Sequence, residues 1–243
     1  RWKQVIGMAK KIIGILGGMG PTATADLFNK IIVSTKAACD QEHLHVIIDS
    51  NTDIPDRTAA LLNGGEDPTE QLVLSARRLQ SAGAELIAMP CNTAHGFYDA
   101  VCAAVDIPVL HMIKLTAQEL RREGVKCAGL LATDGTVRTG IYDKCFEGSG
   151  IELLTPSQDA QSAVMELIYK GVKAGRRDFD TSRFEKAARE LSERGAQTLI
   201  LGCTELPPAF GIYGLHYPHI DPTQHSVLDV IAAFIVNPGA HWR

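Results

Sequence analysis

The sequence lacks several features that would narrow its function at once. No apolar stretch approaches the roughly 18 residues of a membrane-spanning helix, and no apolar core follows the opening residues, so we expect neither a membrane span nor a secretory signal peptide. Basic residues are scattered and the formal net charge is −4, whereas nucleic-acid-binding proteins usually concentrate basic side chains on one face. We therefore expect no membrane or nucleic-acid partner.

The six cysteines also lack the spacing of metal ligands or redox pairs. They stand at positions 39, 91, 102, 127, 145 and 203, and no two are separated as C-x-x-C, the spacing of zinc ribbons and thioredoxin-like sites. A chain of 243 residues buries enough surface to fold without disulfide bonds. We expect a reducing, cytoplasmic setting in which most of these cysteines are small core residues.

Short apolar runs alternate with helix-like segments along the whole chain. The runs are rich in isoleucine, valine and leucine without strict alternation, which is typical of parallel strands covered on both faces. The helices between them have readable ends, including a capping box at Ser182 and Glu185 and terminating glycines at 83, 124 and 195. This alternation predicts an α/β fold with parallel sheets. The predicted strands are Lys11–Leu16, Val46–Asp49, Glu85–Met89, Pro108–Met112, Lys126–Leu131, Ile151–Leu154 and Thr198–Leu201.

An internal repeat divides the chain into two similar halves. Gly83–Cys91 (GAELIAMPC) and Gly195–Cys203 (GAQTLILGC) both run from a helix-ending glycine through a strand to a cysteine. Ile13–Gly20 and Ala128–Gly135 form a second pair in the same order. We predict a first α/β domain over residues 1–113 and a second over residues 114–222, with a C-terminal helix over residues 223–243 that packs back on the first domain.

The repeat puts a cysteine at the carboxyl end of a strand in each half. Ligands of open α/β sheets bind at that edge, and a thiol at a helix N-terminus has a lowered pKa. If the halves face each other across a pseudo-twofold axis, Cys91 and Cys203 enter one cleft from opposite sides. Racemisation suits this arrangement, because one group removes a proton from one face of a carbon and another returns a proton to the opposite face. One such cysteine alone would more often be a core residue.

Four stretches together form a distinctive set: Gly17–Pro21 (GGMGP), Asp53–Thr58 (DIPDRT), Met89–His95 (MPCNTAH) and Leu201–Leu206 (LGCTEL). The set resembles the aspartate/glutamate racemase family over nearly the whole chain. The resemblance implies two flavodoxin-like halves with the active site between them, no pyridoxal phosphate or other cofactor, no metal, and a homodimer. It also implies that Cys91 and Cys203 are the catalytic thiols, and that the substrate is a small acidic amino acid, with aspartate favoured over glutamate.

The resemblance also assigns substrate-binding residues by position. Arg57 and Lys173 are implied to hold the side-chain carboxylate of the substrate, a role that suits a bidentate guanidinium group. His95 is either a neighbour that tunes the Cys91 thiolate or a structural histidine. The other predicted substrate-binding residues are Met19 in the glycine loop, Asn92, Thr93 and Ala94 after the first cysteine, Thr133 in the second half, and Thr204 and Glu205 after the second cysteine.

Other functions stay open at this point. Gly18-Met19-Gly20-x-x-Ala23 fits the dinucleotide fingerprint G-x-G-x-x-A, and Asp49 ends the second strand, as in an NAD-dependent dehydrogenase. Pro21 inside the motif argues against this function. A two-half cleft would also serve a non-catalytic protein that binds acidic amino acids, although binding a carboxylate needs no cysteine. Isomerases and decarboxylases of small diacids are a third class with related folds.

Overall fold

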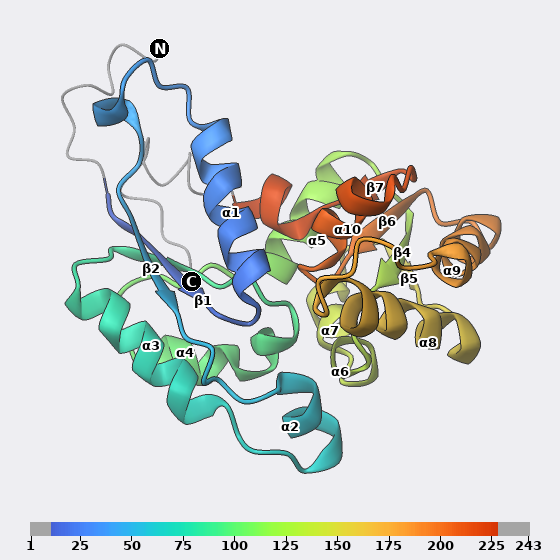
Figure 1. Ribbon diagram of the computed structural model, residues 1–243, viewed down its shortest axis with the longest axis horizontal. Helices are drawn as coiled ribbons and strands as arrows, with labels where there is room; N and C mark the ends of the chain where they lie inside the picture. The colour runs from blue at the N-terminus through green and yellow to red at the C-terminus, as the bar shows by residue number, and fades with distance from the viewer. Residues whose placement is uncertain (1–10, 228–243) are drawn as a thin grey trace.

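The computed structural model describes residues 11–227 and has two lobes, each built around a parallel sheet (Figure 1). In the first half, β1 is the central strand and pairs in parallel with β2 on one side and β3 on the other. The elements of this half are β1 (Ile13–Gly17), α1 (Pro21–Ser34), the 3₁₀ helix η2 (Asp40–Glu42), β2 (Val46–Ser50), α2 (Arg57–Asn63), α3 (Thr69–Ser81), β3 (Leu86–Ala88), the 3₁₀ helix η3 (Thr93–Phe97) and α4 (Tyr98–Ala103).

The second half repeats this arrangement with one more strand. Its strands lie in the order β5-β4-β6-β7, and all neighbouring pairs are parallel. The elements of this half are α5 (Met112–Arg122), β4 (Cys127–Leu131), α6 (Asp134–Arg138), α7 (Ile141–Phe146), β5 (Glu152–Leu154), α8 (Gln158–Glu166), the π-helix η4 (Leu167–Val172), α9 (Ser182–Glu193), β6 (Thr198–Leu201), α10 (Leu206–Tyr213), β7 (His219–Ile220) and the π-helix η5 (Pro222–Val227).

The two sheets have equivalent strand orders, because β2, β1 and β3 correspond to β5, β4 and β6. The fourth strand position, beside β3 in the first sheet and beside β6 in the second, is also equivalent in the two halves. Ile87 in β3 donates its N–H to Pro108 at 2.9 Å, and Leu199 in β6 donates its N–H to Pro218 at the same distance. The predicted α/β fold with two similar parallel-sheet halves is therefore confirmed.

The fourth place in the sheets is where the strand prediction is least accurate. The predicted strand Pro108–Met112 is wrong in its extent: Val109 forms a single parallel bridge to Ile87, and Met112 already begins α5. His111 ends the extended segment because its side chain accepts a hydrogen bond from the N–H of Lys114 at 3.4 Å and so caps α5. The equivalent strand β7 was not predicted, since two residues carry no periodic signal.

The helix ends follow the sequence signals closely, with one correction. Gly83, Gly124 and Gly195 have φ angles of +98°, +77° and +104° just after α3, α5 and α9, which is the left-handed conformation that glycine favours. The predicted capping box at Ser182 does not form. Ser182 is the first residue of α9, and the cap residue Thr181 makes no capping hydrogen bond; its hydroxyl donates instead to the side chain of Glu185 at 2.9 Å.

Helix α5 joins the two halves. Met112 packs with the buried residues of β1 and β3, whereas Ile113, Ala117 and Leu120 pack with those of β4 and α7. The predicted domain boundary at residue 113 therefore falls in the first turn of a helix that contacts both cores. The predicted C-terminal helix over residues 223–243 lies almost entirely outside the described residues. None of the helices over residues 11–227 has the length and apolar character needed to cross a bilayer.

Candidate active site

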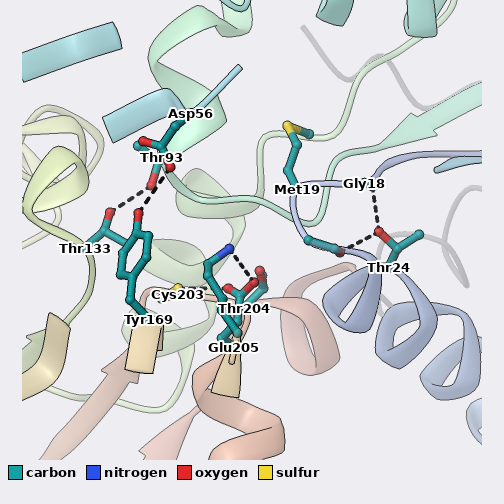
Figure 2. A network of polar contacts seen from close by, with 12 residues as sticks. Gly18, Met19, Thr24, Asp56, Thr93, Thr133, Tyr169, Cys203, Thr204 and Glu205 are labelled. Carbon is teal, nitrogen blue, oxygen red and sulfur yellow. Dashed lines mark hydrogen bonds and ion pairs between the residues drawn. The ribbon is translucent and has the colours of Figure 1, made fainter. Parts of the chain in front are cut away.

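The carboxyl ends of the two sheets face one cavity between the lobes. Every predicted site residue except Ala94 lines this cavity, and Figure 2 shows several of them converging from both halves. The two cysteines are equally buried, with 6% of each exposed. Side chains 112 positions apart in the sequence thus meet at one site because the repeat places both at the carboxyl edge of a sheet. The lining residues are Met19, Asp56, Arg57, Thr58, Cys91, Asn92, Thr93, Thr133, Tyr169, Lys173, Cys203, Thr204 and Glu205.

Cys203, the second cysteine, is bonded to a carboxylate that in turn pairs with a lysine. The thiol of Cys203 donates to Oε2 of Glu205 at 3.1 Å, and Oε1 of the same carboxylate pairs with Nζ of Lys173 at 2.9 Å. Burial raises the pKa of Cys203 well above its ordinary value, and the charge of Glu205 adds to the effect. Burial is the largest single influence on Lys173 and lowers its pKa, but the charge of Glu205, the hydrogen bond to it and the charges of the two cysteines together outweigh burial, so that the pKa is raised. Cys203 is therefore held as a protonated thiol.

The first cysteine has a cation as its charged neighbour. Burial is the largest influence on Arg57 and lowers its pKa, but the charges of Cys91 and Asp56, a side-chain hydrogen bond to Cys91 and the charge of Tyr169 together raise the pKa of the guanidinium group. The two cysteines thus sit in opposite electrostatic surroundings, with Cys91 beside a guanidinium group and Cys203 beside a carboxylate.

The guanidinium group of Arg57 is held by the loops around it, and one of its edges is turned toward the cavity and Cys91. Its Nη1 donates to the carbonyl oxygens of Ile54 and Pro55 at 3.1 and 2.8 Å, and its Nη2 donates to that of Met19 at 3.3 Å. Its Nε is buried without a hydrogen-bond partner. Of the five N–H donors of an arginine, the one on Nε and one on Nη2 remain. These two nitrogens form the edge that binds a carboxylate in a bidentate manner.

A cluster of hydroxyl groups closes the cavity on another side. Thr93 lies 2.9 Å from both Thr133 and Thr136, measured between the Oγ1 atoms, and the latter two are 3.2 Å apart. Thr133 also caps α6, because its Oγ1 accepts the N–H of Thr136. Thr93 belongs to the first half and the other two belong to the second, so these hydroxyl groups join the halves beside the cavity.

Three lining residues were not predicted. Asp56 and Thr58 flank Arg57, and Asp56 caps α2 by accepting the N–H of Ala59 at 2.8 Å. Tyr169 comes from η4, and its hydroxyl donates to Asp56 across the cavity at 3.3 Å. The sequence does contain a signal for Tyr169, because it lies four positions before the predicted site residue Lys173 and residues at this spacing share a helix face.

Ala94 and His95 lie behind the cavity. Ala94 is completely buried and lines no part of the cavity, so its predicted substrate contact remains a prediction. Nδ1 of His95 lies 2.9 Å from the carbonyl oxygen of Cys91, and Nε2 accepts the N–H of Met112 at 3.1 Å. Since Nε2 accepts, Nδ1 carries the proton and donates to Cys91. Burial lowers the pKa of His95 to about 4, so this histidine is a neutral anchor for the backbone of Cys91.

The glycine loop that resembles a dinucleotide fingerprint is filled by the protein itself. A Cβ atom on Gly18 would lie 2.2 Å from the carbonyl oxygen of Asn51, and one on Gly17 would lie 2.3 Å from Cγ2 of Thr24. Thr24 bonds both sides of the loop, accepting from the N–H of Gly18 and donating to the carbonyl of Gly20, each at 2.9 Å (Figure 2). Packing inside the first half therefore accounts for Gly17 and Gly18, whereas a Cβ atom on Gly20, the other glycine of the fingerprint, would lie 3.2 Å from Oε1 of Glu205 in the second half.

Among the described residues, no three histidine, cysteine, aspartate or glutamate side chains are grouped as a metal site.

Comparison with known proteins places this chain in a family. The sequence profile of the family described as Asp/Glu/Hydantoin racemase matches residues 16–230. The broad specificity amino-acid racemase RacX of Bacillus subtilis is 27% identical over 92% of this chain and 98% of its own. The Picrophilus torridus aspartate racemase structure is 32% identical, with a TM-score of 0.78 over 96% of both chains. An aspartate racemase homologue from Pyrococcus horikoshii is 27% identical, with a TM-score of 0.74 over 94% of this chain and all of its own.

Proposed function

Because the chain belongs to the Asp/Glu/hydantoin racemase family, we propose that it racemises a small acidic amino acid, aspartate in preference to glutamate, with two cysteines and no cofactor. The observation that carries the proposal is the meeting of Cys91 and Cys203, from equivalent places in the two flavodoxin-like halves, at one buried cavity. An amino-acid racemase of the Asp/Glu type needs an acid or base on each face of the α-carbon, and a cysteine from each half meets this need.

A two-cysteine mechanism needs one sulfur atom as the acid and the other as the base. In our proposal Cys203, whose thiol donates to Glu205, is the acid at the start, which leaves Cys91 as the base. The Cys91 thiolate takes the α-proton, the electron pair of the broken C–H bond stays on the substrate, and Cys203 gives its proton to the opposite face of the same carbon. The reverse direction starts with the two protonation states exchanged, so both enantiomers are substrates.

The ion pair between Lys173 and Glu205 suggests how a zwitterion is held. An amino acid with a side-chain carboxylate carries one ammonium group and two carboxylates. In our proposal its ammonium group replaces Lys173 beside Glu205, and its side-chain carboxylate bridges Lys173 and the edge of Arg57 that faces the cavity. The α-carboxylate then meets Asn92 and Thr93. Donors at this carboxylate matter most in the transition state, because negative charge grows there as the α-proton leaves.

The size of the cavity supports a small substrate. The space that the centre of a water molecule can reach inside the cavity is about 20 Å³, which is room for about one water. An amino acid is larger, so its binding must separate Lys173 from Glu205 or move the rim contact between Tyr169 and Asp56. A shorter side chain requires less movement, which favours aspartate. One methylene group alone discriminates by only ~1–3 kcal/mol, so we expect slow turnover of glutamate.

Two further proposals concern the setting of the protein. All six cysteines are free thiols, which supports a reducing, cytoplasmic location. The resemblance to aspartate/glutamate racemases supports a homodimer.

The experiment that tests the proposed function follows chirality in purified protein without added cofactor. L- and D-aspartate and L- and D-glutamate are incubated separately, and chiral chromatography measures the opposite enantiomer. Cys91→Ala and Cys203→Ala should each lose at least about 100-fold in rate, since a positioned acid or base contributes roughly 10²–10⁴-fold. Cys127→Ala is the matched control, because this cysteine lies outside the cavity in β4. Racemisation that survives both active-site substitutions would contradict the two-cysteine mechanism.

A further inference from the structure

One buried side chain outside the cavity touches a residue that lines it. Tyr142 in α7 is completely buried, and its hydroxyl lies 2.7 Å from Oδ1 of Asn92. Asn92 lines the cavity and is 2% exposed. The two residues come from different halves, since Asn92 follows the first-half strand β3 and Tyr142 follows the second-half strand β4. Tyr142 itself is not a lining residue, so its effect on a substrate would act through Asn92.

The direction of this hydrogen bond is fixed by its chemistry. A carbonyl oxygen of an amide only accepts, so Tyr142 is the donor and Asn92 the acceptor. Burial raises the pKa of Tyr142 well above its ordinary value. The hydroxyl therefore keeps its proton, and remains a donor, at every pH at which the protein would work.

The other end of the Asn92 amide is left without a partner. Nδ2 of Asn92 is buried and makes no hydrogen bond with the described residues. An unsatisfied buried donor of this kind costs about 1–3 kcal/mol, and such groups call for an explanation. An asparagine amide has two nearly isosteric orientations that exchange its oxygen and nitrogen. A tyrosine hydroxyl can also accept from an amide N–H, but with the amide turned round its own buried proton would lose the acceptor Oδ1, and no other acceptor for it is found among the described residues. The buried hydroxyl of Tyr142 therefore favours the orientation in which the N–H groups of Asn92, rather than its oxygen, are left for a ligand.

We propose that Tyr142 is a positioning residue that fixes the side-chain amide of Asn92 so that its N–H groups bind the α-carboxylate of the substrate. The inference rests on the proposed function, since it takes the ligand to be an amino acid. Without Tyr142, the amide is free to turn its oxygen toward the substrate, and a carbonyl oxygen facing a carboxylate is repulsive. The amide would then have to be reoriented each time a substrate binds.

The equivalent position in the second half has a contact of the same kind. Thr204 follows Cys203 as Asn92 follows Cys91, and its hydroxyl donates to the carbonyl oxygen of Pro90 in the first half at 3.1 Å. In each half, the residue after the cysteine is thus held by the opposite half. The orientation of Asn92 accordingly depends on contact between the halves, so the carboxylate site is complete only when they are together.

The test is a double-mutant cycle between Tyr142→Phe and Asn92→Ala. Tyr142→Phe keeps the buried ring and removes one oxygen atom. We expect it to lower kcat/KM for both enantiomers of aspartate by about 10- to 100-fold and to raise Kd in calorimetry, because hydrogen bonds to charged groups have this magnitude. In the Asn92→Ala background, Tyr142→Phe should have no further effect. Tyr98→Phe is the matched control, since it removes a 2.7 Å bond from a partly buried tyrosine to the carbonyl oxygen of Val109.

The outcomes separate the inference from the function on which it rests. If the wild-type protein racemises aspartate but Tyr142→Phe has wild-type kcat/KM and Kd, Tyr142 does not position Asn92. Losses that add in the double variant would also overturn the inference, because a purely structural tyrosine would weaken the protein whatever stands at position 92. If the wild-type protein neither binds nor racemises aspartate or glutamate, the proposed function fails, and this inference fails with it.

Discussion

Replacing Gly135 by alanine would place a methyl group where the two halves meet beside the cavity. A Cβ atom at this position of α6 would lie 2.8 Å from Oγ1 of Thr58, 3.0 Å from the Cα of Thr58 and 3.0 Å from Cγ2 of Thr93. Two of these atoms belong to α2, whose first residue is Arg57. A rotation of a side chain relieves the contact with Oγ1 but not the one with Cα, so α2 must move.

The magnitude follows from the crowding and from the role proposed for Arg57. Overpacking of this kind costs about 1–3 kcal/mol, so the free energy of unfolding, measured with urea, should fall by that amount. A displacement of about 1 Å in a substrate-binding group costs up to about 100-fold, so kcat/KM for aspartate should fall by about 10- to 100-fold. Chiral chromatography of the product gives this second quantity.

Gly211→Ala is the control for the same chemical change. Gly211 lies inside α10, and a Cβ atom there would meet nothing within 4 Å. Alanine is the better helix former, so this variant should gain about 0.5–1 kcal/mol and keep its activity. Wild-type stability together with wild-type kcat/KM in Gly135→Ala would refute the reasoning, because it would mean that α2 and α6 are not in contact during catalysis.

Three other substitutions test the charges and the buried histidine. Glu205→Gln should lower the pKa of Cys203 relative to the wild type, because it removes the negative charge beside the thiol, and iodoacetamide should then alkylate Cys203 faster near neutral pH; an unchanged rate would contradict the assigned cause. Lys173→Met should cost about 3 kcal/mol in urea unfolding by leaving the buried carboxylate of Glu205 unpaired, and adding Glu205→Gln should recover most of it; equal stability of the single and double variants would count against the ion pair. His95 takes up a proton near pH 6.5 when unfolded and only near pH 4 when folded, so its contribution to stability is present above pH 6.5 and is lost as the pH falls toward 4. Between pH 7 and pH 5 the wild type should therefore lose about 2 kcal/mol more than His95→Gln, and parallel curves would show that His95 is not held neutral.

The sequence predicts the strands well where apolar runs are long enough to cross a buried sheet. The runs that become β1, β4 and β6 are fully or almost fully buried, and burial on both faces is what their composition indicates. The fourth strand place is poorly predicted in both halves because it is short: a bridge at Val109 and the two residues His219–Ile220. Hydrophobic periodicity needs more residues than this to give a signal.

The candidate active site likewise has features that the sequence predicts and features that it does not. The two cysteines are predictable because the repeat marks them as equivalent. The bond from Tyr142 to Asn92 and the bond from Tyr169 to Asp56 are not, because each joins residues of different halves and depends on how the halves dock. Local patterns in a sequence carry no information about that docking.

The most direct test of the two-cysteine mechanism is the fate of deuterium during early turnover. L-aspartate is incubated in D₂O with the wild-type protein, the reaction is stopped while little has been converted, and the enantiomers are separated and examined by NMR. If the group that removes the proton differs from the group that returns one, the D-aspartate formed carries deuterium at its α-carbon while the remaining L-aspartate keeps its proton. Deuterium in both enantiomers at equal rates from the start would mean that one base serves both faces, and would contradict the roles proposed for Cys91 and Cys203.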